Sequence, residues 1–168
     1  LRGWSVLNAA RAEQAGFELD YLLRGVRVAD VMSPDPVTAP ADLTVEALVR
    51  HYVALYRCSA FPVVGGDGSP VGLVTLSRLR EVPDELRATT TLAQVATPLE
   101  RVVTARADDM VVDLLARFTV GTGRRALVVD NGNLVGIVTA SDLERTLEVA
   151  ELGGAGAVGT RSDPTWTT

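Results

Sequence analysis

The sequence contains a single cysteine, Cys58, and a single histidine, His51, and this scarcity excludes several kinds of site. One cysteine cannot form an intrachain disulfide or a cysteine-based zinc site, and one histidine cannot build a histidine-rich metal site. Neither a phosphate-binding P-loop nor a Gly-x-Gly-x-x-Gly segment after a strand is present. We therefore expect a chain that catalyses no reaction and requires neither a metal nor a cofactor.

The sequence also lacks a long hydrophobic run and an excess of positive charge. No segment approaches the roughly 20 apolar residues that span a bilayer, and no signal peptide is visible. The net charge of -5 disfavours nonspecific nucleic-acid binding, which needs a basic surface. Because 47% of the 168 residues are hydrophobic, the chain can bury a core. Leu1 is not an initiator methionine, so we expect the chain to be part of a longer protein.

An internal repeat is the dominant feature of the sequence. Three pairs of segments correspond at a separation of 64 to 66 positions: 37–42 with 103–108, 70–79 with 134–143, and 30–34 with 94–98. The separation changes where loops are expected, and loops tolerate insertions. We therefore divide the chain into an N-terminal linker or capping helix (1–25), two repeats (26–90 and 91–150) and a flexible, glycine-rich tail (151–168).

Hydrophobic periodicity predicts the same order of elements in each repeat: strand, helix, strand, strand, helix. In the first repeat we expect strands at 37–39, 60–64 and 70–75, and one helix whose apolar face holds Val45, Leu48, Val49, Tyr52, Val53 and Tyr56. In the second repeat we expect strands at 102–105, 125–129 and 134–139, a helix with Val111, Leu114, Leu115 and Phe118 on one face, and a last helix that buries Leu143 and Leu147. The fold class is therefore mixed α/β (α+β), with a three-stranded sheet in each unit. A unit of about 60 residues is only marginally stable alone, so we expect two units to share a core about a pseudo-twofold axis.

Four short motifs in residues 26–150 are typical of a known family. They are Val-Met-Ser-Pro at 31–34, Phe-Pro-Val-Val at 61–64, Gly-Leu-Val-Thr at 72–75 and Gly-Ile-Val-Thr-Ala-Ser-Asp at 136–142. On these motifs the sequence resembles a tandem pair of CBS domains, also called a Bateman module. The resemblance implies two CBS units that act as a regulatory module, commonly as a homodimer. It also implies an adenine nucleotide or adenosyl ligand: AMP, ADP, ATP or S-adenosylmethionine.

Residues 1–24 and 58–64 carry a second resemblance, to bacterial site-2-protease-type zinc metalloproteases. Many of those proteins carry a CBS pair after their last membrane helix. The His-Glu-x-x-His zinc motif of that family is absent from this sequence, so we expect any protease chemistry upstream of Leu1. The resemblance implies a cytoplasmic module that controls an attached membrane protease and contacts the membrane only through that parent protein. The alternative for residues 1–24 is a helix that caps the CBS pair.

The CBS resemblance assigns ligand-binding residues to the second repeat. In the pattern Gly-apolar-apolar-Thr-x-x-Asp, Thr139 serves a phosphate and Asp142 serves the ribose, with Ser141 between them. A hydroxyl and free amides at a helix start can hold a phosphate, and a carboxylate accepts hydrogen bonds from ribose hydroxyls. The family's adenine side corresponds to Val103, Thr104, Ala105, Arg125, Ala126 and Leu127, and Arg124 is near enough in sequence to offer a phosphate charge.

The first repeat departs from the pattern, because Thr75 is kept but Arg78 stands where the aspartate is expected. An arginine cannot accept a hydrogen bond from a ribose hydroxyl, so we expect one nucleotide per chain, bound at Asp142. Two alternatives stay open. Thr139 and Asp142 also fit an ordinary helix start. A ligand-free dimerisation or scaffolding module of a transporter, channel or other enzyme fits the same repeat, with apolar faces supplied by Tyr52, Tyr56, Val111, Leu115 and Phe118.

Overall fold

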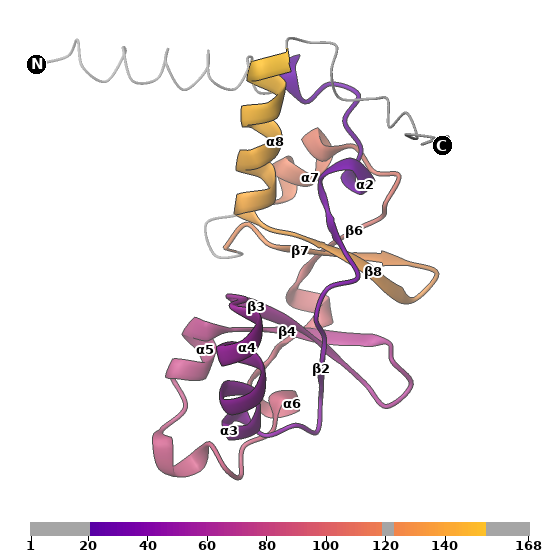
Figure 1. Cartoon of the computed structure of the whole chain (residues 1–168). Coiled ribbons are helices and arrows are strands. Elements are labelled where there is room, and N and C mark those ends of the chain that lie inside the picture. The colour runs from indigo at the N-terminus through magenta and orange to yellow at the C-terminus, as the bar shows by residue number, and fades with distance from the viewer. Residues whose placement is uncertain (1–20, 119–122, 154–168) are drawn as a thin grey trace, which may run out of the picture.

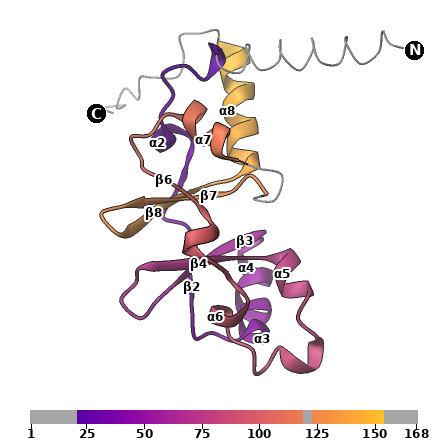
Figure 2. The same ribbon diagram turned by 180° about the vertical axis from the view of Figure 1, so that it is seen from behind.

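The computed structural model describes residues 21–118 and 123–153, which form two lobes of similar construction (Figures 1 and 2). In both views the two sheets face each other, and the labelled helices lie on their outer sides. The expected N-terminal capping helix and C-terminal tail fall largely outside the described residues. Within 21–118 and 123–153, no helix is both long enough and apolar enough to cross a bilayer.

Each lobe contains a mixed four-stranded sheet. One sheet has the order β1 (Ser33–Pro34), β8 (Asn133–Val138), β7 (Ala126–Asp130) and β6 (Val103–Ala105). The other has the order β2 (Ala39–Pro40), β3 (Ala60–Val64), β4 (Pro70–Thr75) and β5 (Thr97–Pro98). In both sheets the first long strand lies parallel to a short strand and forms an antiparallel hairpin with the next strand. The four hairpin strands, β3, β4, β7 and β8, agree with the expected positions to within one residue at each end. They could be predicted because each is an apolar or alternating segment between clear turn residues.

The helices of the first lobe follow the expected order, but the main one is not a single regular α-helix. It consists of α3 (Val45–Leu48), a π-helical segment η1 (Val49–Val53) and α4 (Ala54–Tyr56). A π-helical turn holds more residues than an α-helical turn, so it shifts the phase of the apolar face. Val45 and Leu48 are fully buried, whereas 38% of Val49 and 46% of Tyr56 is exposed. The predicted continuous apolar face is therefore fully buried only at its start, while Tyr52 and Val53 are partly buried against the same core.

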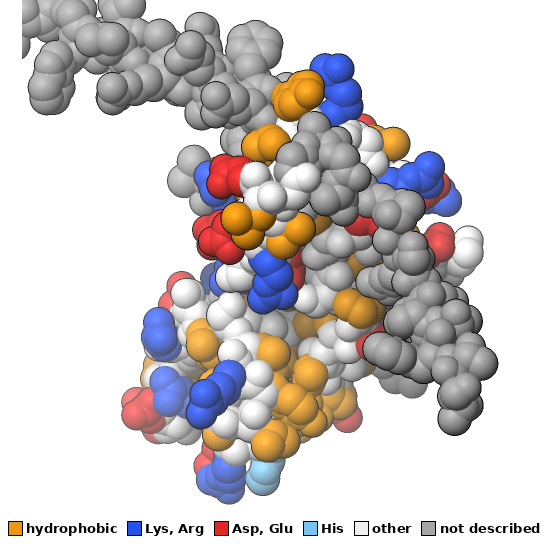
Figure 3. Space-filling view, turned by 45° about the horizontal axis from the view of Figure 1, so that its top comes forward, with side chains coloured by type: hydrophobic (Ala, Val, Ile, Leu, Met, Phe, Trp, Pro, Cys, Tyr) orange, Lys and Arg blue, Asp and Glu red, His pale blue; other side chains and the backbone are white. Residues whose placement is uncertain are grey.

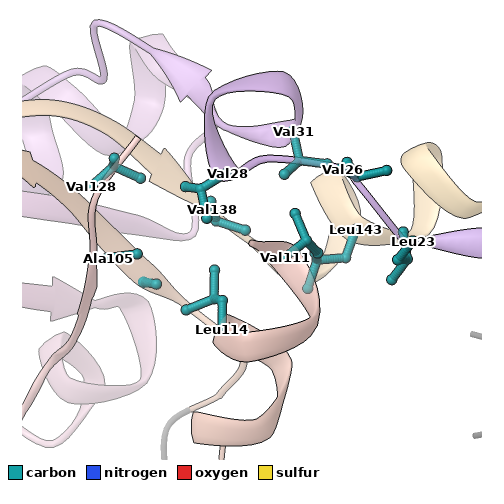
Figure 4. Close-up of a cluster of buried hydrophobic side chains, with 11 residues drawn as sticks. Leu23, Val26, Val28, Val31, Ala105, Val111, Leu114, Val128, Val138 and Leu143 are labelled. Carbon is teal, nitrogen blue, oxygen red and sulfur yellow. The ribbon is translucent and has the colours of Figure 1, made fainter. Parts of the chain in front are cut away.

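The remaining helices complete the two lobes. They are α5 (Leu76–Arg80), η2 (Asp84–Leu86) and α6 (Leu92–Val95) in the first, and α2 (Val28–Val31), η3 (Leu99–Arg101), α7 (Val111–Arg117) and α8 (Ala140–Gly153) in or beside the second. Helix α8 buries Leu143, as expected from its spacing, and Leu147 packs against the same cluster. Figure 4 shows that cluster, in which side chains from α2, α7 and α8 converge on β6, β7 and β8.

The two lobes exchange their leading segments, which the sequence did not predict. Helix α2 and strand β1 begin the first repeat but belong to the second lobe, where Ser33 lies opposite Ile137 of β8. Helix α6 and strand β5 begin the second repeat but belong to the first lobe, where Thr97 lies opposite Leu73 of β4. Each sheet therefore has four strands rather than the three expected. The added strand pairs with an edge that would otherwise expose unpaired backbone groups.

A small apolar cluster joins the two sheets. It consists of Ala60 and Leu73 from the first lobe and Leu127 and Ile137 from the second. All four are at most 8% exposed. Because they alternate along their strands with residues of the two lobe cores, each sheet is buried on both faces. This shared contact supplies the common core that two small units need.

The exchanged strands require glycine on the strands that receive them, and this gives a stability prediction. A Cβ at Gly72 would overlap the backbone carbonyl oxygen of Thr97, which is held in the β4–β5 pairing. We expect Gly72→Ala to lower the free energy of unfolding by about 1–3 kcal/mol, the usual cost of overpacking. Denaturant unfolding followed by circular dichroism measures the change.

Gly66 in the β3–β4 turn offers a matched control, because a Cβ there would meet nothing within 4 Å. We expect Gly66→Ala to change the free energy of unfolding by no more than about 0.5 kcal/mol. Equal effects of the two substitutions would show that the close approach of β5 to Gly72 does not limit stability.

Candidate functional site

Two cavities open where the lobes meet, and the repeat relates one to the other. Each cavity lies between the second hairpin strand and following helix of one lobe and the start of the first hairpin strand of the other lobe. One cavity lies between β8–α8 and β3, and the other between β4–α5 and β7. The Asp142 cleft has a volume of about 280 Å³ and is lined by Ser33, Pro36, Val37, Arg57, Cys58, Ser59, Ala60, Pro62, Ile137, Thr139 and Asp142. The Arg78 cleft also has a volume of about 280 Å³ and is lined by Leu73, Thr75, Ser77, Arg78, Thr97, Arg101, Val102, Val103, Gly123 and Arg125.

Asp142 lies in the first turn of α8, and only 9% of its surface is exposed. Its Oδ2 accepts hydrogen bonds from the backbone N–H of Thr139 at 2.8 Å and from the Thr139 hydroxyl at 2.7 Å. Its Oδ1 accepts a hydrogen bond from the Ser33 hydroxyl at 3.0 Å. The backbone N–H of Asp142 in turn points to Thr139 Oγ1 at 3.4 Å. Thr139 and Asp142 therefore form a reciprocal cap at the start of α8.

This arrangement leaves Asp142 with accepting capacity. A carboxylate offers about four lone-pair positions, and three hydrogen bonds are made here. All three donors are neutral, and within the described residues Asp142 forms no ion pair. The Ser33 hydroxyl can rotate, because it is held by a single hydrogen bond among the described residues. The site can therefore accept hydrogen bonds from a ligand with neighbouring hydroxyl groups.

The structure brings only part of the predicted set together. Thr139 and Asp142 line one cleft, whereas Val103 and Arg125 line the other, beside Thr75 and Arg78. The other predicted positions line neither cleft: Ser141 is exposed on α8, Thr104 is half-buried in β6, Ala105, Ala126 and Leu127 are buried, and Arg124 borders a third cavity beside α8. Val103 and Arg125, the two expected adenine-side residues that line a cleft, thus lie at the helix start of the opposite lobe rather than of their own.

The residues that do accompany Asp142 come from the first repeat, and sequence reasoning missed them. Val37, Ser59 and Ala60 occupy the positions equivalent to Val103, Arg125 and Ala126, at a separation of 66. Applying the repeat to the predicted set would have given these three as candidates, but not the cleft that they line. Two more were missed: Ser33 enters with the exchanged strand β1, and Arg57 lines the cleft from the end of α4 with a φ of 51°.

The Arg78 cleft has a different set of polar contacts. The Thr75 hydroxyl accepts a hydrogen bond from the backbone N–H of Arg78 at 3.3 Å, as the Thr139 hydroxyl does for Asp142. The Arg78 guanidinium lies 3.3 Å from Glu81 in an exposed ion pair. Arg125 donates from Nη2 to the Ser59 hydroxyl at 3.2 Å. Because Ser59 lines the Asp142 cleft, the Arg125–Ser59 pair is a wall between the two cavities.

Comparison of the sequence with known proteins finds a family and close relatives. The description "CBS domain" applies to residues 28–85 and again to 90–148. A protein named "Putative zinc metalloprotease Rip3" from Mycobacterium tuberculosis (strain H37Rv) is 41% identical over 99% of this chain. "Zinc metalloprotease MJ0392" from Methanocaldococcus jannaschii is 22% identical over 88% of this chain. The chain spans about 41% and 40% of the lengths of these relatives, and the predicted resemblance to metalloprotease-associated CBS pairs is confirmed.

Solved structures with the same fold are CBS pairs. CBSX2 in complex with AMP has a TM-score of 0.66 at 22% identity, covering 76% of this chain and 99% of that one. The CBS domain of a bacterial CNNM/CorC family Mg2+ transporter in complex with ATP has a TM-score of 0.67 at 22% identity, covering 82% and 97%. The pair of protein MJ0100 with 5-methylthioadenosine and S-adenosyl-L-methionine has a TM-score of 0.63 at 23% identity, covering 74% and 97%. These similarities confirm the predicted fold class of two related α/β units.

Proposed function

The chain belongs to the CBS domain family, with two copies in tandem, and we propose that the pair is a regulatory module that binds an adenine nucleotide or another adenosyl compound. The observation that carries the proposal is the buried Asp142 carboxylate at the wall of a cavity between the lobes. A buried carboxylate is costly unless its charge is used or satisfied, and it suits a pair of neighbouring hydroxyls. The ligand's ribose would contact Asp142.

The remaining walls of the Asp142 cleft fit the other parts of an adenosyl compound. Val37, Ala60 and Ile137 offer apolar surface for a purine base. The Arg57 guanidinium offers donors for a phosphate or another polar group. The volume of about 280 Å³ is close to the lower end of ligand pockets, about 300 Å³, and favours a ligand of nucleoside or mononucleotide size. Similar CBS pairs solved with AMP, ATP and S-adenosyl-L-methionine support this ligand class.

The relatives support the second part of the proposal, which concerns what the module controls. Both are named zinc metalloproteases, and the chain matches 41% and 40% of their lengths. We place this CBS pair in the cytoplasmic part of a membrane-tethered protease, where ligand binding changes the activity of the attached enzyme. The fragment itself catalyses no reaction in this proposal. Homodimerisation is part of it, with Val49, Leu55 and Tyr56 exposed on the helix of the first lobe; Figure 3 shows hydrophobic side chains gathered on that lobe.

A ligand-free scaffolding module is the second candidate, and one observation favours it. Among the described residues no buried side-chain nitrogen or oxygen lacks a hydrogen-bond partner. Asp142 is therefore satisfied by Thr139 and Ser33 without a ligand. A cap of this kind is a sufficient structural reason for an aspartate at the third position of a helix.

Titration calorimetry with AMP, ADP, ATP and S-adenosylmethionine distinguishes the two candidates. We expect at least one of these compounds to bind with one molecule per chain, because Arg78 cannot accept hydrogen bonds from a second ribose. Binding must also raise the melting temperature, since a ligand at a hundredfold its dissociation constant stabilises the folded state by about 2.7 kcal/mol. Absence of heat and of any melting shift with all four compounds would establish the scaffolding module instead.

A further inference from the structure

The Arg78 cleft concentrates positive charge on a chain whose net charge is negative. Three arginines line it, Arg78, Arg101 and Arg125, together with the hydroxyl residues Thr75, Ser77 and Thr97. No aspartate or glutamate is among the described residues that line this cavity. The cleft therefore presents hydrogen-bond donors and positive charge, but no carboxylate to accept from a ribose.

The repeat shows that this charge is particular to one cleft. At separations of 64 and 66 positions, the residues equivalent to Arg78, Arg101 and Arg125 are Asp142, Asp35 and Ser59. Two arginines thus replace acids and one replaces a neutral hydroxyl, while the backbone around them is repeated. The Asp142 cleft has one carboxylate and one arginine, Arg57, in its lining, whereas the Arg78 cleft has three arginines and, among the described residues, no carboxylate. Since the two clefts share a framework but differ in charge, they select different ligand chemistry.

The charges of the three arginines are poorly compensated within the described residues. Arg78 has one partner, Glu81, in an exposed pair that contributes little. Arg125 is held by neutral groups, the Ser59 hydroxyl at 3.2 Å and the Gly123 carbonyl at 3.4 Å. Arg101 is in no ion pair in the described part of the chain. Like charges around one cavity repel each other, and an anion between them relieves that repulsion.

We propose that the Arg78 cleft binds a free phosphate anion of the diphosphate or oligophosphate class, without a nucleoside. The guanidinium group presents a planar fork that binds phosphate oxygens in pairs, which makes three arginines and adjacent hydroxyls a suitable set. A diphosphate carries two phosphate groups, so more than one guanidinium can bind in this way. The module then reads two chemically different signals, one in each cleft. This inference goes beyond the proposed adenosyl function and does not depend on it.

Calorimetric titration of the full chain with sodium diphosphate at low ionic strength tests the proposal, because salt screens exposed charges. We expect binding at one site per chain, and at least tenfold weaker binding by Arg101→Gln and by Arg78→Gln. Arg106→Gln is the matched control: Arg106 is exposed, pairs with Asp108 at 3.4 Å and does not line the cleft. Its diphosphate affinity should stay within twofold of the wild type. Circular dichroism and melting of each variant establish that it is folded.

Titrations with adenosine and ADP distinguish binding of a free anion from binding of the phosphate groups of a nucleotide. For a free anion, saturating adenosine and the substitution Asp142→Asn leave the diphosphate affinity unchanged. The proposal is overturned if diphosphate gives no heat, or if Arg106→Gln weakens binding as much as Arg101→Gln. It is also overturned if only ADP binds through the arginines, or if diphosphate binding is lost in Asp142→Asn. Failure of adenosine to bind would count against the adenosyl function alone, because the diphosphate arm contains no nucleoside.

Discussion

A fragment of residues 26–90, the first repeat by sequence, is expected to be unfolded or aggregated in solution. It keeps strand β1 without its partner β8, and it lacks α6 and β5, which belong to the first lobe. The missing Leu92 is fully buried, and loss of such a side chain costs about 2–5 kcal/mol. A lobe of about 60 residues has little stability to lose. Circular dichroism and a thermal melt of the purified fragment measure the outcome.

A fragment of residues 35–99 is the matched comparison, because it has the same length as 26–90 and follows the lobe rather than the repeat. It contains β2 to β5 and keeps the hydrogen bonds that Leu92 and Ala93 make with Leu43 and Ala41, at 2.8 and 2.9 Å. We expect it to show more helical signal and a more cooperative melt than 26–90. It still exposes Ala60 and Leu73, so it should remain less stable than the whole chain. A sharp melt of 26–90 alone would contradict the exchange of leading segments.

The repeat, the hairpins and the order of elements were predictable, because each depends on residues close together in the sequence. The turn between β7 and β8 is an example: Asn131 and Gly132 both have positive φ, 49° and 78°, as an Asn-Gly hairpin turn requires. The exchange of β1 was not predictable in this way. Ser33 pairs with Ile137, far along the chain, in a strand of two residues that carries no periodicity.

The candidate site shows the same division between local and long-range information. The cap formed by Thr139 and Asp142 follows from four consecutive residues and was found in the sequence. The residues across the cleft could not be chosen, because two similar units can place either strand edge against either helix start. The structure places Ser59 rather than Arg125 in the Asp142 cleft, and this placement gathers three arginines in the other cleft, which contains no carboxylate among its described lining residues.

Substitution of Asp142 by alanine is the most informative change in the adenosyl site. It removes the carboxylate that would accept from the ribose hydroxyls, so we expect binding of an adenosyl ligand to weaken by about 1.5–3 kcal/mol. That loss corresponds to roughly a 10- to 150-fold increase in the dissociation constant. The substitution also removes one half of the α8 cap and the partner of Ser33, so the free energy of unfolding should fall by about 0.5–2 kcal/mol. Calorimetry and denaturant unfolding measure the two effects separately.

Asp113→Ala provides the control for the helix-start charge alone. Asp113 lies in the first turn of α7, is exposed, and lines neither cleft. We expect it to cost about 0.3–1 kcal/mol of stability through the helix dipole and to leave ligand affinity unchanged. If Asp142→Ala loses stability but binds the ligand as tightly as the wild type, Asp142 is only a cap and the ribose lies elsewhere. If only Asp142→Ala loses affinity, measured on folded protein, the Asp142 carboxylate contacts the ligand. Both substitutions remove a negative charge from the first turn of a helix, but only Asp142 lines a cleft.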